Sequence, residues 1–172
     1  KKKNVLYAIN GTGQGHISRA KSLLPYLRKH VNVDVLMSGK MQRFDFGQPI
    51  KYKCKGFTFV YEQGGVNWFK TVFNTDLIRF VYDIVSIDLS HYDLVISDFE
   101  PVSAWSSFLK RKRCMNVSHQ ASFKSLKTPR PTSWPLFLVP EAFLRLFSYS
   151  REYMGFHFKS YDSFIFPPVI HD

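Results

Sequence analysis

VLYAINGTGQGHISRAKSLLPYL, residues 5–27, decides the fold that we predict for this chain. Residues 4–9 form a short apolar run that is typical of a buried strand. Residues 16–30 place apolar side chains on one face at helical spacing. A glycine-rich turn, G-T-G-Q-G, joins the two segments. A strand, a tight turn and a helix in this order indicate the opening unit of a parallel α/β sheet.

The same alternation continues along the chain. Apolar patterns predict strands at 31–37, 51–61, 93–97, 114–118 and 164–166, and helices at 66–89, 101–110 and 136–150. The segment at 51–61 is either one strand or two strands around Gly56. This order predicts an α/β, Rossmann-like fold with a mainly parallel sheet and helices on both faces. We expect the aromatic helix at 66–89 to lie mostly in the core. Ligands of such folds bind at the carboxyl ends of strands, where the polar segments 11–16, 97–101 and 118–122 fall.

Composition narrows the class of protein. The formal net charge of +11 indicates an anionic partner, such as a phosphorylated substrate, an acidic membrane or a nucleic acid. Only Cys54 and Cys114 are present, which excludes a disulfide framework or a cysteine metal site and fits a reducing cytoplasm. No apolar run approaches the roughly 18 residues of a membrane-spanning helix.

The glycine turn does not fit two well-known phosphate-binding loops. His16 occupies the third glycine position of a dinucleotide fingerprint, and the second strand ends without a carboxylate, which disfavours NAD. The lysine of a Walker loop is also missing. What remains is a turn that leads into a helix N-terminus, where anions are favoured and a neutral His16 could act as a general base. The alternative is that the glycines serve only the turn and that His16 caps the helix.

At this point a family resemblance becomes specific. The stretch G-T-G-Q-G-H-I-S-R-A resembles the N-terminal half of GT-B glycosyltransferases. It is similar to the family of the lipid-linked N-acetylglucosaminyltransferase of peptidoglycan synthesis (glycosyltransferase family 28-like), and to uncharacterised bacterial and archaeal glycosyltransferase-like proteins. The resemblance extends to the closing F-P-P-V-I. It implies an acceptor-binding domain at 1–168 and the start of an interdomain linker at 169–172, with a C-terminal nucleotide-sugar domain outside this chain.

The resemblance also implies a reaction. Such enzymes transfer a sugar from a nucleotide sugar, here expected to be a UDP-sugar, to a hydroxyl group without a metal or another cofactor. His16 matches the family histidine that is proposed to deprotonate the acceptor. The loop that approaches the donor diphosphate comprises Gly11, Thr12, Gly13, Gln14 and Gly15, with Gln14 in place of a family glycine. The acceptor would be a glycan or a lipid-linked molecule of the cell envelope, and the isolated domain is expected to be inactive.

Further candidates follow the later strands. Asp98 and Glu100 could each orient His16 or hydrogen-bond sugar hydroxyls, because carboxylates are strong acceptors. We favour Asp98 as the catalytic partner of His16 and Glu100 as an acceptor ligand. Alternatively, either carboxylate caps the helix that begins at Pro101. Arg19 could hold an anionic acceptor, or it could be a surface arginine.

The fifth predicted strand leads to another polar pair. His119 and Gln120 partly match a His-Glu-Gln stretch of the peptidoglycan enzyme family, and the resemblance implies that they contact the acceptor. The alternative is an ordinary polar loop.

A basic run at Lys110–Arg113 precedes apolar segments at 134–140 and 143–147. Basic and aromatic residues together suit a membrane interface, which predicts a peripheral position on the cytoplasmic face of a membrane. The alternative is that these cations only complement the end of a helix.

Two rival functions remain open from the sequence. One is a sugar-nucleotide epimerase with the same GT-B fold. The other is a non-catalytic basic module that binds a polyanion, although no nucleic-acid motif is present and nucleic acid is not the expected partner.

Overall fold

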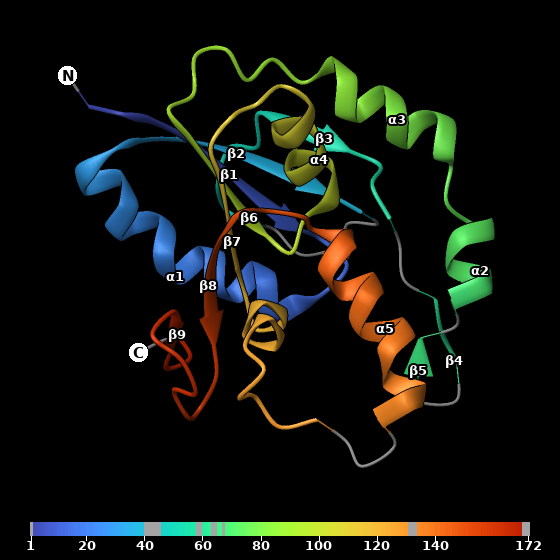
Figure 1. The fold of residues 1–172 in the computed structure, drawn as a ribbon. Coiled ribbons are helices and arrows are strands. Elements are labelled where there is room, and N and C mark those ends of the chain that lie inside the picture. The colour runs from blue at the N-terminus through green and yellow to red at the C-terminus, as the bar shows by residue number, and fades with distance from the viewer. Residues whose placement is uncertain are drawn as a thin grey trace.

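A computed structural model of the chain describes residues 2–39, 46–57, 60–62, 65–66, 68–130 and 134–169. Its main sheet is parallel, seven-stranded and ordered β3-β2-β1-β6-β7-β8-β9 (Figure 1). These strands are β1 (Asn4–Asn10), β2 (Asn32–Ser38), β3 (Tyr52–Cys54), β6 (Leu94–Asp98), β7 (Cys114–Ser118), β8 (Glu152–Phe156) and β9 (Ile165–Phe166). A separate antiparallel pair comprises β4 (Tyr61–Glu62) and β5 (Gly65–Val66).

Helices cover both faces of this sheet, as predicted (Figure 1). They are α1 (Gln14–His30), α2 (Trp68–Phe73), α3 (Leu77–Ser86), α4 (Pro101–Leu109), the 3-10 helix η1 (Gln120–Lys124) and α5 (Trp134–Phe147). Successive side chains of a strand point to opposite faces. In β1, Tyr7 and Ile9 pack against α1, whereas Leu6 and Ala8 pack in the cluster that includes Ile84 of α3 and Val102 of α4. The Rossmann-like prediction is therefore confirmed.

The order of the strands creates a natural binding position. From β1 the chain moves outward through β2 to β3, and β6 then returns to the other side of β1. The loops after β1 and β6 consequently leave the sheet in opposite directions. In open parallel sheets a crevice forms at this reversal, beside the carboxyl ends of the strands.

Most predicted elements are present within a residue or two of their predicted limits, and β7 has the predicted limits at 114–118. Of the two alternatives predicted for 51–61, the single strand is wrong, whereas β3 precedes Gly56 and β4 begins after it at Tyr61. Gly56 has φ +54°, a left-handed conformation that turns the chain out of the extended path. The strand β8 is missing from the predicted elements. It is only five residues long, and it begins at Glu152, just after the helical pattern predicted to end at Ser150.

The single helix predicted at 66–89 is also wrong, since α2 and α3 are separate. Asp76 caps α3 by accepting a hydrogen bond from Arg79 N at 3.0 Å, which starts a new helix. We expected this region to lie mostly in the core, but in α3 only one face is buried, and Ile84 on that face packs in the core. An outer stripe of α3 is exposed instead, and consists of Leu77, Ile78, Val81, Tyr82 and Val85. Among the described helices, none is long and apolar enough to cross a bilayer.

Glu100 begins α4 and is fully buried. Its carboxylate accepts hydrogen bonds from Val102 N at 2.8 Å, Ser103 N at 2.6 Å and Ser38 Oγ at 2.5 Å. Burial raises the pKa of Glu100, and the hydrogen bonds from Ser38, Ser103 and Val102 offset this only in part. The residue therefore joins the N-terminus of α4 to the end of β2 through a desolvated group.

We predict that Glu100→Ala lowers the free energy of unfolding by about 2–4 kcal/mol, because it removes a helix cap and leaves buried donors without acceptors. Denaturant unfolding of the variant and the wild type measures this loss. The control is Glu152→Ala, which removes an exposed carboxylate paired with Arg113 and should cost no more than about 1 kcal/mol. Equal losses in the two variants would contradict the assigned role.

Candidate active site

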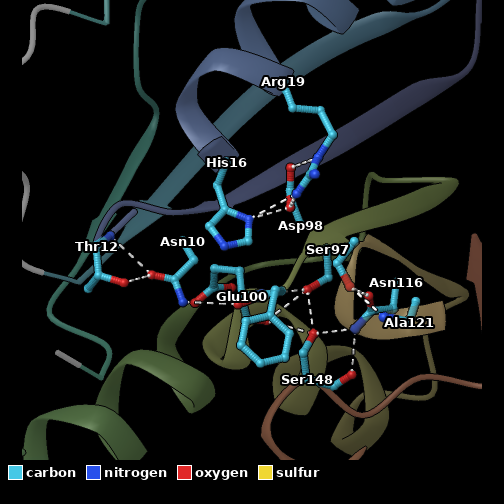
Figure 2. A network of polar contacts seen from close by, with 12 residues as sticks. Asn10, Thr12, His16, Arg19, Ser97, Asp98, Glu100, Asn116, Ala121 and Ser148 are labelled. Atoms are coloured by element: carbon cyan, nitrogen blue, oxygen red, sulfur yellow. Dashed lines mark hydrogen bonds and ion pairs between the residues drawn. The ribbon is translucent and has the colours of Figure 1, made fainter. Parts of the chain in front are cut away.

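The predicted site residues His16 and Asp98 meet beside the carboxyl ends of β1 and β6 (Figure 2), where open parallel sheets form their binding crevice. Asp98 is the last residue of β6, and His16 lies in the first turn of α1. The Nδ1 atom of His16 is 2.6 Å from Oδ1 of Asp98, although 82 positions separate the residues in the chain. The expectation that Asp98 orients His16 fits this contact.

The contact also defines the tautomer of the imidazole. Asp98 is fully buried and ionised, so a neutral His16 must carry its hydrogen on Nδ1 and donate it to the carboxylate. Nε2 then retains a lone pair, and no described residue bonds to it. The imidazole is partly accessible, with 15% of the side chain exposed. The ring therefore presents a proton acceptor to whatever enters the crevice.

Arg19 balances the charge of Asp98. Its Nε donates to Oδ2 at 2.8 Å and its Nη2 donates to Oδ1, while Tyr7 donates to Oδ2 at 3.4 Å. Burial alone would raise the pKa of Asp98, but the hydrogen bonds from His16 and Arg19, together with the charge of Arg19, outweigh it and hold the pKa below its ordinary value. Nη2 of Arg19 also lies 3.0 Å from Nδ1 of His16. Both nitrogens carry hydrogens in this tautomer, so we treat that approach as packing rather than a hydrogen bond.

Arg19 was predicted as an acceptor ligand, with a surface arginine as the alternative. Its side chain is only 7% exposed, which does not fit a surface arginine. The guanidinium is directed at Asp98, and it also lies 5.3 Å from the ring centre of Phe156. This geometry favours a positioning role for Arg19, and acceptor binding stays a prediction.

Phe99, which lies between Asp98 and Glu100 in the sequence, is a part of the site that the motifs do not predict. Its φ of 49° is left-handed, which is uncommon and costly for a bulky residue. The buried ring is nearly parallel to the His16 ring, with 11° between the planes and 6.2 Å between the centres. An aromatic residue between two acidic residues at the end of a strand was the available signal.

Asn10 was also missed, and it joins the two loops of the crevice (Figure 2). Its Oδ1 accepts from Thr12 N at 3.1 Å and from Thr12 Oγ1 at 2.6 Å. Its Nδ2 donates to the carbonyl of Phe99 at 3.1 Å. Asn10 therefore fixes the glycine loop relative to the segment that follows Asp98.

The glycines of the loop have different surroundings. Gly11 N donates to Ser38 O at 2.7 Å, and a Cβ atom on Gly11 would lie 3.0 Å from the same oxygen, so close approach to β2 requires glycine. A Cβ atom on Gly15 would meet no atom within 4 Å. The fold therefore does not need glycine at position 15, where the surface is open.

The first turn of α1 has the features of an anion-binding end. Gly13 is the N-cap residue and supplies no side-chain hydrogen bond, and the first turn contains no acidic residue. Gln14 and Gly15 are exposed. Unpaired N–H groups and the positive end of the helix dipole favour a phosphate there.

The other predicted acceptor residues differ in how far they are buried and in what they contact. Glu100 is enclosed by the contacts that cap α4, so the geometry favours the helix-cap interpretation and its acceptor role stays a prediction. His119 Nδ1 lies 3.0 Å from the carbonyl of Phe156, whose ring centre is 6.1 Å from that of His119. Phe156, on the unpredicted strand β8, thus contacts both His119 and Arg19. Gln120 begins η1, and its buried Oε1 has no partner among the described residues.

A second polar network connects β6, β7 and the residue that follows α5 (Figure 2). Asn116 Nδ2 donates to the carbonyl of Ser148 at 2.8 Å, and Ser97 Oγ lies 2.9 Å from Ser148 Oγ. These buried bonds hold the end of α5 against β6 and β7. The described residues contain no group of three or more His, Cys, Asp or Glu side chains that could hold a metal ion.

Comparisons with known proteins agree with this architecture. Among solved structures, the chain is similar to a UDP-N-acetylglucosamine 2-epimerase, with a TM-score of 0.53, 14% identity, and coverage of 90% of this chain and 42% of that one. A structure from Listeria monocytogenes, provisionally assigned as a UDP-N-acetylglucosamine 2-epimerase, gives a TM-score of 0.50 and 10% identity, with coverage of 90% and 39%. At these identities the likeness shows the fold alone, and the chain spans about two fifths of either structure.

The chain matches no curated protein. A family model described as Glycosyl transferase family 1 matches residues 3–134, which include β1, the glycine loop, His16 and Asp98. The resemblance to glycosyltransferases of the GT-B fold is thereby confirmed, and the chain belongs to glycosyl transferase family 1.

Proposed function

We propose that this chain is the acceptor-binding part of an enzyme that transfers a sugar from a nucleotide sugar, such as a UDP-sugar, to a hydroxyl group. The observation that carries the proposal is the 2.6 Å contact between His16 Nδ1 and Asp98, which leaves Nε2 as a proton acceptor in the crevice. Family membership supports sugar transfer as the class of reaction.

The proposed chemistry uses each group in turn. Nε2 of His16 takes the proton of the acceptor hydroxyl while its oxygen attacks the anomeric carbon of the donor. The bond between that carbon and the diphosphate oxygen breaks, and the nucleoside diphosphate leaves with the bonding electrons. Asp98 stabilises the imidazolium that forms, as a carboxylate does in a catalytic triad.

The leaving diphosphate gains negative charge during this step. The uncapped first turn of α1, after Gly13, is suited to lie against that charge. The opening beside Gly15 would admit the phosphate oxygens close to the backbone. Most of the nucleotide-sugar site would belong to a second domain of the full-length protein, so the chain alone is expected to be inactive.

Two rival functions can be separated by their products. A sugar-nucleotide epimerase, suggested by the fold of the two solved structures, would change the donor sugar without an acceptor. A binding module for polyanions would change neither molecule. The full-length protein should be incubated with UDP-sugars, with and without candidate glycan or lipid-linked acceptors, and with a metal chelator present. A glycosylated product that appears only with an acceptor supports transfer without a metal, whereas an epimerised donor overturns it.

We also propose that a membrane surface contacts the exposed apolar stripe of α3, since Ile78 is 86% exposed and the chain carries a net charge of +11. This helix is a stronger candidate than residues 134–140, whose side chains lie outside the described part of the chain. An apolar helix face on a cationic protein suits the interface of anionic lipids, on the cytoplasmic face of a membrane.

We predict that His16→Ala lowers kcat of the full-length enzyme by about 10²–10⁴-fold, the usual contribution of a general base. The fold should survive because Arg19 still neutralises Asp98. The control is His30→Ala, at the exposed end of the same helix, which should retain activity. Full turnover by His16→Ala would contradict the role of this residue as a base.

Asp98→Asn tests the positioning role of the carboxylate. We expect a loss of activity together with a loss of about 3–5 kcal/mol in unfolding free energy, because Arg19 becomes a buried charge without its counterion. The pKa of Asp98 is lowered in the folded state, so its stabilising effect is present above the pKa of an unfolded aspartate, about 3.9, and is lost as the pH falls through the folded-state value. The free energies of unfolding of the variant and the wild type should therefore converge as the pH falls. A difference that stays constant at all pH values would contradict this account.

Gly15→Ala separates binding from folding. We predict unchanged or slightly increased stability, because a Cβ atom there meets nothing within 4 Å and alanine favours a helix. Activity should fall by about tenfold or more if phosphate oxygens approach this backbone. Thermal unfolding and the KM for the donor measure the two effects, with Ser18→Ala on the exposed face of the next turn as the control. Full activity would exclude close approach of the donor at Gly15.

Ile78→Asp combined with Val81→Asp tests the membrane contact. We predict at least about tenfold weaker sedimentation with vesicles that contain phosphatidylglycerol, since two apolar side chains no longer enter the interface. Leu126→Asp combined with Phe158→Asp adds the same charge at exposed apolar positions elsewhere and should bind normally. Equal binding by all three proteins would contradict the contact.

A further inference from the structure

A concave region lies at the amino ends of the strands, at the other end of the sheet from the candidate active site. It has a volume of about 790 Å³, within the range of ligand sites, and lies between α4 and the start of β7 and β8. Cys114 and Glu152, the first residues of these two strands, line it. Asp98 lies at the carboxyl end of the neighbouring parallel strand β6, so the two regions are separated by the length of the sheet.

Three cations near this groove already have partners. Lys110 Nζ donates to the carbonyls of Val85 at 2.8 Å and of Ile87, at the end of α3. Lys112 Nζ donates to the carbonyl of Ser90 at 2.8 Å. The basic run was expected to stabilise the end of the helix that precedes it, α4. Lys110 instead binds carbonyls at the end of α3, and no described hydrogen bond joins a side chain of the basic run to α4.

Arg113 is also paired, because its Nε and Nη2 donate to the two carboxylate oxygens of Glu152 at 2.7 and 2.9 Å. That bond neutralises the acidic side chain that lines the groove. Arg111 and Arg151 line the same groove, and within the described part of the chain neither guanidinium has a hydrogen bond or ion pair, although Arg111 N donates to Phe108 O at 3.3 Å. Two exposed guanidinium groups thus remain without an anion.

The backbone of Arg111 shows that this position is not optimised for stability. Its φ of 53° is left-handed, at the residue that follows the C-cap Lys110 of α4. Lys112 N donates to Ser107 O at 2.8 Å, the bond that closes a Schellman motif, in which glycine is the preferred residue at this position. An arginine there strains the backbone and places a charged side chain at the groove.

The opposite wall of the groove is aromatic. Tyr149 and Phe108 line it, and their rings meet edge to face with centres 5.3 Å apart. Trp105 contacts both rings, with its ring centre 6.2 Å from that of Tyr149 and 5.8 Å from that of Phe108. The volume exceeds that of a phosphate group alone, so a ligand would place an apolar or planar part against these rings.

We propose that this groove binds a phosphate-bearing ligand, whose phosphate groups pair with Arg111 and Arg151 and whose apolar part lies on Tyr149 and Phe108. Arginine suits this ligand because its planar guanidinium donates two parallel hydrogen bonds to phosphate oxygens. The net charge of +11 opposes occupation by a second copy of the chain. The phosphate could belong to a free metabolite or to a lipid headgroup, and the site does not depend on the proposed function.

Isothermal titration of the full-length protein with pyrophosphate tests the site. Arg111→Ala combined with Arg151→Ala should raise the Kd for pyrophosphate by about tenfold or more, because two charge-assisted contacts are lost. Lys53→Ala combined with Lys127→Ala removes the same charge from exposed positions elsewhere and should leave the Kd unchanged. Equal binding by the groove variant, or equal weakening in both variants, overturns the site.

The crevice beside His16 could also take pyrophosphate, so His16→Ala and Gly15→Ala are titrated in parallel. Binding that these variants retain and the groove variant loses belongs to the groove, even if the enzyme shows no sugar transfer. Vesicles of phosphatidylglycerol identify the source of the phosphate. Vesicle binding that depends on Arg111 and Arg151 indicates a lipid headgroup, whereas pyrophosphate binding without it indicates a free phosphate ligand.

Arg111→Gly gives an independent measurement. Relief of the left-handed strain should raise Tm by about 2–4 °C while pyrophosphate binding weakens. A lower Tm, or unchanged binding with a higher Tm, overturns the inference that stability is lost at this position for the sake of a ligand.

Discussion

The buried carboxylate of Asp98 is the constraint on which the crevice depends. A charge at the end of a central strand, with no exposed surface, is tolerated only if its neighbours neutralise it. Arg19 supplies that charge from one helical turn beyond His16, so the residue that keeps Asp98 ionised also fixes α1 against β6. The pair that stabilises the fold is thus the pair that holds the imidazole in one tautomer.

Two non-glycine residues of the described chain have a left-handed backbone, Phe99 and Arg111. Each lies at one end of the α4 region, and neither conformation benefits local stability. Phe99 turns the chain between Asp98 and Glu100, which lets one carboxylate face α1 while the other caps α4. Arg111 turns the chain after α4 and directs a cation to the distant groove. The helix is therefore bounded by two strained residues that serve different surfaces.

Sequence patterns were sufficient for the central sheet, because β1, β6 and β7 are short apolar runs with clear boundaries. They also predicted that His16 and Asp98 would approach each other, since both follow parallel strands. They favoured Asp98 over Glu100 as the partner of His16, but they could not show that the turn made by Phe99 directs these two carboxylates to different places. The burial of Arg19 was equally hidden, since it results from contacts with Asp98 and with Phe156 on a strand that local periodicity did not indicate.

The excess of positive charge has a different meaning at each place in the fold. Arg19 is buried and neutralised by Asp98, and Lys110 and Lys112 are bound to backbone carbonyls, so these cations act within the structure. Composition alone assigns all of them equally to an anionic partner. Only the cations left unpaired beside a concave surface can take part in recognition, and Arg111 and Arg151 meet that condition together. The net charge of a basic domain therefore indicates a partner only after the internal uses of its cations have been subtracted.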